Sequence, residues 1–214
     1  PMLKLNTSVN FEKRSPLENN TGWSLFKKNR EYGSNIPENI LLNHISQIAK
    51  HTTILFESTV AYTPFYRYRV ANGAKAKDRS ISPTFTFTYK GGYVDQRFDL
   101  LQLKMRDHLS IGTGSDFDFE ITTGTFLDKP EFFQDFAHFN GNEYIYSPTD
   151  PIKFFRTLPY YKYSTNGSYL SLTSNYQFRK FLISHIPFIR RKGIRENIIL
   201  NSLFLKKHLS LQHL

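Results

Sequence analysis

The chain has 214 residues, and its 28 lysines and arginines outnumber 18 aspartates and glutamates, which gives a net charge of +10. This length suits one domain or a large part of one, and the basic balance suits phosphate-bearing partners such as nucleic acid or a lipid surface. The absence of cysteine excludes disulfides, thiolate catalysis and cysteine zinc sites, whereas an aromatic content of 16% favours β-strands.

The first pattern along the chain is an alternation over residues 3–12. One side carries Leu3, Leu5, Thr7, Val9 and Phe11, and the other carries Lys4, Asn6, Ser8, Asn10 and Glu12. A period of two predicts a strand with one apolar and one polar face. Its length is close to the ~10 residues of a tilted transmembrane strand, but an edge strand of a soluble sheet has the same pattern.

Residues 13–50 form a long polar connection. Leu41, Ile45 and Ile48 have helical spacing after Pro37, which predicts one short helix near residues 40–50. Long connections are unusual in compact soluble domains. They are normal on the outer side of a membrane barrel, so this loop favours that architecture.

More strands are predicted downstream, over residues 52–62, 83–92, 98–106, 117–126, 169–178 and 198–205. The clearest alternates Phe85, Phe87 and Tyr89 with threonines, and Gly91-Gly92 is expected to end it. If this face meets lipid, its rings should lie on one side of a long strand and be exposed. The stretch AKAKDRS (Ala74–Ser80) is predicted to be a solvated loop after a turn at Asn72-Gly73.

No apolar run approaches the roughly 18 residues of a transmembrane helix. Alternating strands of a membrane barrel would escape the same test, because they average out in a hydropathy window. The N-terminal PMLKLNTSV has no signal-peptide pattern. We therefore expect either that a leader has been removed or that the chain is an internal piece of a longer protein.

The strongest candidate for a catalytic or metal-binding site consists of Asp135, His138, Asn140 and Asn142. A carboxylate and an imidazole three residues apart could bind a metal or act as an acid–base pair. We favour a turn instead, with Gly141 at positive φ and the asparagines bonding backbone. The other histidines are interpreted as ordinary surface or strand positions: His44, His51, His108, His185, His208 and His213.

The C-terminal region is strongly basic. Arg190, Arg191 and Lys192 follow several phenylalanines, a combination found in nucleic-acid patches and beside anionic lipid head groups. No RRM, helix-turn-helix or KH pattern accompanies it, so nucleic acid is not the partner that we expect. No nucleophile-elbow or dinucleotide motif is present either.

Three segments together resemble a known family: DFAHFNGN (Asp135–Asn142), LPYYKYSTN (Leu158–Asn166) and FLISHIPFIRRK (Phe181–Lys192). The motif residues are Asp135, His138, Phe139, Asn140, Gly141, Asn142, Pro159, Tyr160, Tyr161 and Pro187. The family comprises large Gram-negative outer-membrane proteins of unassigned function, which usually carry an N-terminal carboxypeptidase-regulatory-like domain ahead of a β-barrel. The resemblance covers about residues 51–205.

A more distant similarity links His138–Asn142 to the surface-antigen barrels that assemble or translocate outer-membrane proteins. No Arg-Gly-aromatic tripeptide follows Asn142, so that segment does not support such a role. The chain also has Ser171, Thr173, Asn175 and Tyr176 where the family tends to place acidic residues and histidines. It ends at Leu214 without the family's closing strands, which indicates a fragment, because open strand edges cannot sit in hydrocarbon.

These patterns and the resemblance predict an all-β protein, an antiparallel meander that forms the C-terminal part of an incomplete transmembrane β-barrel. Residues 1–214 would be a single partial barrel domain. The resemblance implies a non-enzymatic outer-membrane protein of transport or assembly, without cofactor. Its expected partners are outer-membrane lipid and other outer-membrane or periplasmic proteins. The alternatives are a soluble β-sandwich that binds carbohydrate and a basic nucleic-acid-binding protein.

Overall fold

The computed structural model describes residues 1–16, 48–71, 73–141, 150–156, 158, 161, 163–179, 186 and 195–206. Seven strands form one sheet in the spatial order β1 (Met2–Arg14), β2 (His51–Thr63), β5 (Thr84–Val94), β6 (Phe98–Ile111), β7 (Ser115–Asp128), β8 (Tyr169–Phe178) and β9 (Glu196–Leu205). All neighbouring pairs are antiparallel. The all-β antiparallel meander is therefore confirmed.

A second, two-stranded sheet interrupts this meander. β3 (Tyr66–Ala71) and β4 (Ala74–Ser80) form a hairpin between β2 and β5, which pair directly with each other. The prediction of a solvated loop at Ala74–Ser80 was wrong, because this charged stretch pairs with the aromatic strand before it. The turn at Gly73 is present, with φ of +77°. The structure does not describe residues 17–47, and most of the helix predicted near residues 40–50 falls in that stretch.

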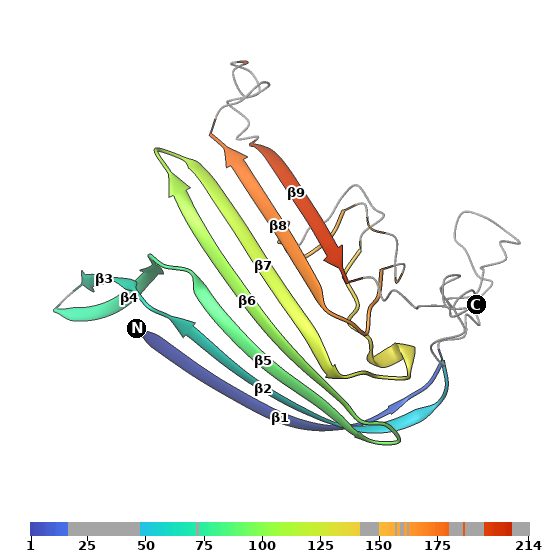
Figure 1. Cartoon of the computed structure of the whole chain (residues 1–214). Coiled ribbons are helices and arrows are strands. Elements are labelled where there is room, and N and C mark those ends of the chain that lie inside the picture. Colours follow the sequence, from blue (N-terminus) through green and yellow to red (C-terminus); the bar gives the residue numbers. More distant parts are fainter. Residues whose placement is uncertain are drawn as a thin grey trace, which may run out of the picture.

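The sheet is curved, and β1 and β9 are its two edges (Figure 1). We call the end with the β6–β7 turn and the β3–β4 hairpin the upper end. The lower end holds the β5–β6 turn and a short 3-10 turn, η1 (Phe133–Asp135). Nothing in the described part of the chain is a helix long and apolar enough to cross a membrane.

Strand alternation divides the sheet into two contrasting faces. The register aligns the apolar positions of every strand, as in the pairs Val9↔Phe56 and Val60↔Phe87. Phe87 in turn pairs with Leu103, and Ile121 pairs with Leu172. We call the side that carries these residues the apolar face and the opposite side the polar face.

A small core lies on the lower part of the polar face. Leu55, Phe98 and Phe126 are buried there together, with Leu100 and Ala137 packed against them. Gly91-Gly92 was predicted to end β5, but the strand continues to Val94. A side chain at Gly92 would collide with the ring of Phe98, so the glycine makes room for this core.

Candidate functional site

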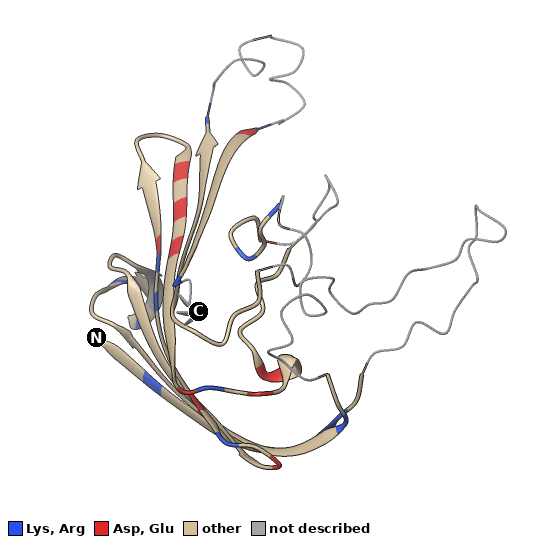
Figure 2. Ribbon diagram, turned by 45° about the vertical axis from the view of Figure 1, so that its right-hand side comes forward, with Lys and Arg blue, Asp and Glu red and all other residues tan. Residues whose placement is uncertain are grey.

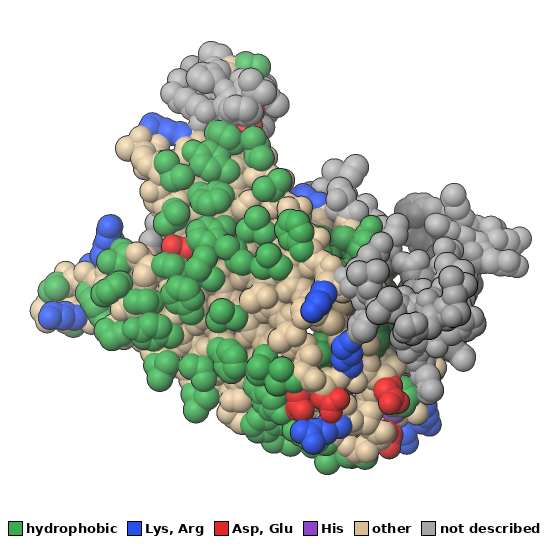
Figure 3. Space-filling model, in the orientation of Figure 1, with side chains coloured by type: hydrophobic (Ala, Val, Ile, Leu, Met, Phe, Trp, Pro, Cys, Tyr) green, Lys and Arg blue, Asp and Glu red, His purple; other side chains and the backbone are tan. Residues whose placement is uncertain are grey.

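The apolar face is a continuous hydrophobic surface that stays exposed. Its exposed large side chains include Leu3, Leu5, Val9, Phe11, Ile54, Tyr62, Phe85, Phe87, Leu103, Leu109, Ile111, Leu170, Ile198, Leu200 and Phe204. Figure 3 views this side and shows hydrophobic side chains spread over it. A contiguous patch of this extent marks an interaction surface, since monomeric soluble proteins rarely leave one uncovered.

Phe85 and Phe87 behave as the alternation predicted. They lie on one side of β5 and are 37% and 45% exposed. The described strands provide no second sheet that packs over them, since β3 and β4 pair only with each other. Within β6 the same face carries Asp99 at its lower end and Asp107, which accepts a hydrogen bond from the His108 N–H.

Polar groups bound the apolar face at the lower end. The Tyr89 hydroxyl donates to Asp99 and lies 3.0 Å from the Tyr93 hydroxyl. The Arg97 guanidinium lies 3.3 Å from Asp99 and 3.8 Å from Asp128. Tyrosines with charged neighbours at the rim of an apolar band are typical of membrane–water interfaces.

The upper part of the polar face holds a charged ladder across β6 and β7. Lys104 lies 3.3 Å and Arg106 lies 3.9 Å from Glu120, and His108 lies 2.6 Å from Asp118. The acidic residues of β7 form a column along the strand (Figure 2). These partners face one another because the register pairs Arg106 with Glu120.

The described part of the connection between β7 and β8 (residues 129–141, 150–156, 158, 161 and 163–168) folds back along the polar face (Figure 2). We call it the β7–β8 segment. Its Asp150 pairs with Arg106, and the Thr173 hydroxyl donates to the Ile152 carbonyl at 2.8 Å. Ile152 is 1% exposed, which places the segment firmly against the strands.

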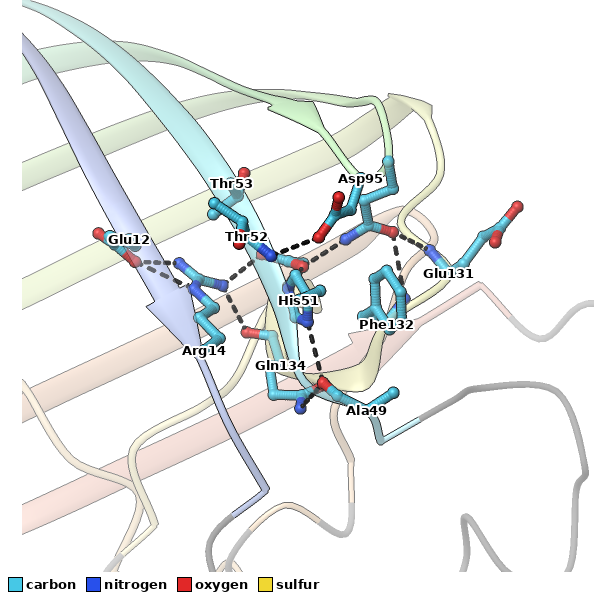
Figure 4. Close-up of polar contacts among 12 residues, drawn as sticks. Glu12, Arg14, Ala49, His51, Thr52, Thr53, Asp95, Glu131, Phe132 and Gln134 are labelled. Atoms are coloured by element: carbon cyan, nitrogen blue, oxygen red, sulfur yellow. Dashed lines mark hydrogen bonds and ion pairs between the residues drawn. The ribbon is translucent and has the colours of Figure 1, made fainter.

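Asp135 anchors the lower end of this segment. Its carboxylate, fully buried, accepts hydrogen bonds from Arg14 of β1 and from Gln96 in the β5–β6 turn. It also lies 2.8 Å from Nε2 of His51, at the start of β2. Arg14 donates as well to the Gln134 carbonyl, at 3.0 Å (Figure 4). One carboxylate thus connects the end of β1, the start of β2 and the β5–β6 turn to η1.

His51 occupies an unusual position in this network. Its Nδ1 lies 3.1 Å from the Ala49 carbonyl oxygen, and its ring stacks on Phe132 with centroids 4.1 Å apart. The carbonyl can only accept, and an ionised Asp135 can only accept. Both ring nitrogens of His51 lie within hydrogen-bond distance of an oxygen atom, one from Ala49 and one from Asp135. His51 lies in a strand, one of the two settings that the sequence suggested, but it is 2% exposed and bound to Asp135, so it is not a surface position.

The structure separates the two groups that the sequence placed together as an acid–base or metal pair. Asp135 joins the network above, whereas Nδ1 of His138 lies 2.8 Å from the Ser164 hydroxyl. The His138 ring packs edge-on against Phe133 and Tyr161, and this partial burial lowers its pKa. Within the described residues, no three His, Asp or Glu side chains are grouped to hold a metal.

The rest of the motif binds the segment to the sheet and to itself. The Phe139 ring packs against Tyr169 of β8 with centroids 5.1 Å apart. The Asn140 carbonyl accepts the Phe155 N–H at 2.8 Å. Gly141 does not have the positive φ that we predicted. Glycine is required because a Cβ there would collide with the Leu158 carbonyl oxygen.

Several residues singled out in the sequence have no described position. They are Asn142, Pro159, Tyr160 and Pro187 of the motif and the basic residues Arg190, Arg191 and Lys192. Ser171, Thr173 and Asn175 lie on the polar face of β8, opposite Thr122, Glu120 and Asp118 of β7. Sequence reasoning missed Arg14, His51 and Gln96, since no local pattern links them to Asp135.

Comparison with known families finds one match. The model of a family described as "Family of unknown function (DUF5686) C-terminal domain" matches residues 1–210, a longer stretch than the three motifs indicated. No curated protein and no solved structure matches the chain.

Proposed function

The chain belongs to the DUF5686 C-terminal domain family, whose function is unknown, and from this premise we propose that its sheet is part of an outer-membrane β-barrel wall. The apolar face would contact lipid and the polar face would line the interior, with the β7–β8 segment inside. We propose transport or assembly, rather than catalysis, as the role. The exposed hydrophobic face across seven strands carries this proposal.

The dimensions of the sheet support a membrane wall. From Ile54 to Tyr62, β2 advances eight residues, or ~26 Å at ~3.3 Å per residue. Barrel strands tilt by about 40°, so these residues would span ~20 Å of an apolar band that is about 25 Å tall in known barrels. The opposite face supplies charged and hydroxyl groups, as expected of a barrel interior.

The anchored segment supports a role in controlled passage. A barrel interior that holds a folded segment is plugged, and its opening depends on the contacts that hold the plug. Here those contacts are the Asp135 network at the lower end and the Arg106–Asp150 pair above it. No observation favours the carbohydrate-binding sandwich, because Phe85 and Phe87 are exposed on an open face.

Spin labelling of the full-length protein in membranes tests the proposal directly. These 214 residues contain no cysteine, so none of them competes with a cysteine introduced for labelling. Phe87→Cys and Thr86→Cys form a matched pair, since they are neighbours on β5 that lie on opposite faces. We expect dissolved oxygen to relax the label at 87 and an aqueous nickel chelate to relax the label at 86.

A soluble protein gives a different result. If the label at 87 responds to the nickel chelate as strongly as the label at 86, the face does not contact lipid and the proposal fails. Recovery of the protein in the soluble fraction without detergent would be equally decisive against it.

A further inference from the structure

The β3–β4 hairpin has no role in the wall described above. It leaves the sheet at the upper end of β2 and β5, and the seven-stranded order is complete without it. An isolated two-stranded hairpin is at best marginally stable in water. Its composition therefore indicates what surrounds it.

The base of the hairpin is fixed in direction. The Thr63 and Thr84 hydroxyls lie 2.8 Å apart, and the Ile81 N–H donates to the Phe65 carbonyl at 3.1 Å. The Ser82 hydroxyl accepts the Phe65 N–H at 3.0 Å. These bonds hold the hairpin as an extension of β2 and β5. The hairpin therefore has a fixed position relative to the apolar face.

The hairpin exposes aromatic and aliphatic side chains together with basic ones. Tyr68 and Val70 lie on one face and are 55% and 65% exposed, and Lys75, opposite Val70 in the register, is exposed beside them. Arg67 and Arg69 are exposed on the other face. Neither face carries the uniform apolar surface that contact with hydrocarbon requires.

The apolar face continues onto this hairpin. Tyr62 is the last residue of β2 on the apolar face. The exposed side chains of Phe65 and Ile81 lie beyond it at the hairpin base. Figure 3 shows hydrophobic side chains that extend onto the projection, with lysines and arginines at its outer margin. Because β2 alone crosses about the height of an apolar band, residues beyond Thr63 lie at the head-group level.

We propose that the β3–β4 hairpin is a binding surface for the phosphate-bearing head groups of anionic membrane lipids, an inference that rests on the proposed membrane location. Tyrosines prefer the interface, where the ring meets apolar chains and the hydroxyl meets water. Arg67, Arg69 and Lys75 supply the charge that attracts phosphate, and arginine can bind it in a bidentate manner. This lipid contact covers a hairpin that would otherwise be marginal.

Lipid binding by the detergent-solubilised full-length protein tests whether the positive charges of the hairpin attract anionic head groups. Phosphatidylglycerol and phosphatidylcholine are titrated into wild-type protein and into the Arg67→Gln/Arg69→Gln variant, and bound lipid is counted by native mass spectrometry. We expect the variant to lose roughly fivefold in phosphatidylglycerol affinity for each arginine. Phosphatidylcholine binding should not change, and Arg67→Lys/Arg69→Lys, which keeps the charge but not the bidentate geometry, should lose less phosphatidylglycerol affinity than the glutamine variant. The matched control, Lys4→Gln/Lys90→Gln, removes two charges from the polar face and should behave as wild type.

A spin label on the hairpin tests whether the hairpin lies at the level of the lipid head groups. With Ala76→Cys, we expect a nickel chelate carried on lipid head groups to relax the label more than the free aqueous chelate does. If the label at 87 is in lipid but the hairpin label responds only to the free chelate, this inference fails and the wall stands. If the label at 87 is in water, both fail. Loss of single-stranded DNA binding in Arg67→Gln/Arg69→Gln, with lipid binding unchanged, would overturn the inference in favour of nucleic acid.

Discussion

At the residue scale, Asp135 illustrates how one side chain can decide the position of a whole segment. Its carboxylate is fully buried between the side chains of Arg14 and His51, which are 18% and 1% exposed. A buried ion pair contributes little net stability when intact, but removing one partner leaves an uncompensated charge. Loss of Asp135 would leave Arg14 paired with Glu12, which is 36% exposed, and would leave the buried His51 without its carboxylate partner.

Asp135→Asn should lower the free energy of unfolding by about 1 to 3 kcal/mol, because Arg14 and His51 lose a fully buried hydrogen-bond partner, while Arg14 keeps its ion pair with Glu12. Urea unfolding of the protein in lipid or detergent measures this loss. Glu131→Gln is the control, since that side chain is exposed and only its backbone N–H bonds Gln96. A loss below ~1 kcal/mol for Asp135→Asn would mean that the network is not a structural anchor.

Gly141→Ala should also destabilise the β7–β8 segment. The new methyl group would collide with the Leu158 carbonyl oxygen, and overpacking of this kind costs about 1 to 3 kcal/mol. Gly167→Ala is a matched control in the same segment, because its nearest atoms would be 3.6 and 3.8 Å away. The same unfolding measurement compares the two variants. Equal effects would show that the Leu158 carbonyl is not the constraint.

Prediction of individual contacts from the sequence failed where the two residues in contact are far apart in the chain. Arg14 and Asp135 are 121 residues apart, and His51 and Asp135 are 84 apart. No periodicity connects such positions, so His51 carried the same signal as any other strand histidine. At Gly141 the sequence indicated glycine's conformational freedom, whereas the structure requires its small size.

At the element scale, alternation predicted the strands well because it is a local property. Phe85 and Phe87 were placed on the correct strand and face from a period of two alone. β4 was missed because only the small side chains of Ala74 and Ala76 alternate with charged residues there, and the strand depends on its pairing with β3. The β7–β8 segment had no regular pattern, and its position depends on contacts with other elements.

This segment should loosen in two steps as the pH falls. Burial alone would raise the pKa of Asp150, but the Arg106 guanidinium outweighs it and the net pKa is lowered. A carboxylate with a lowered pKa contributes stability above its ordinary value of 3.8, and that contribution is lost as the pH falls through the folded-state pKa. For His138 the lowered pKa favours the neutral ring, so its contribution is complete above pH 6.5 and declines below it.

Hydrogen exchange of the segment amides, corrected for the intrinsic pH dependence of exchange, would follow both steps. We expect protection near His138 to weaken below about pH 6.5 and protection of residues 150–156 to weaken below about pH 4. Protection in β5 should be constant over the first step. The His138→Gln variant should lack the first step and retain the second. A first step that persists in that variant would exclude His138 as its cause.

At the scale of the whole molecule, the medium on each side of the sheet determines which substitutions are tolerated. Leu103 lies within β6 on the apolar face, and Thr88 lies on the polar face of β5. A protein wall in lipid penalises charge on one side only. A soluble sheet with both faces in water would show no such difference.

Leu103→Arg should therefore lower the free energy of unfolding in a bilayer by about 2 to 4 kcal/mol, the cost of arginine near the membrane midplane. Thr88→Arg should cost under ~1 kcal/mol, since the new charge faces water and one hydroxyl contact with Thr59 is lost. Urea titration of vesicle-reconstituted protein measures both. Similar costs for the two variants would contradict a lipid-facing surface.

The long span of the Asp135 network also bears on the order of assembly. Each strand of the meander pairs with a neighbour that is close in the sequence, except where the hairpin and the long connections intervene. Ring closure between distant residues has a higher entropic cost than pairing of adjacent strands. Arg14 and His51 can therefore reach Asp135 only after their strands have docked, and formation of this junction would mark the completion of folding at the lower end of the sheet.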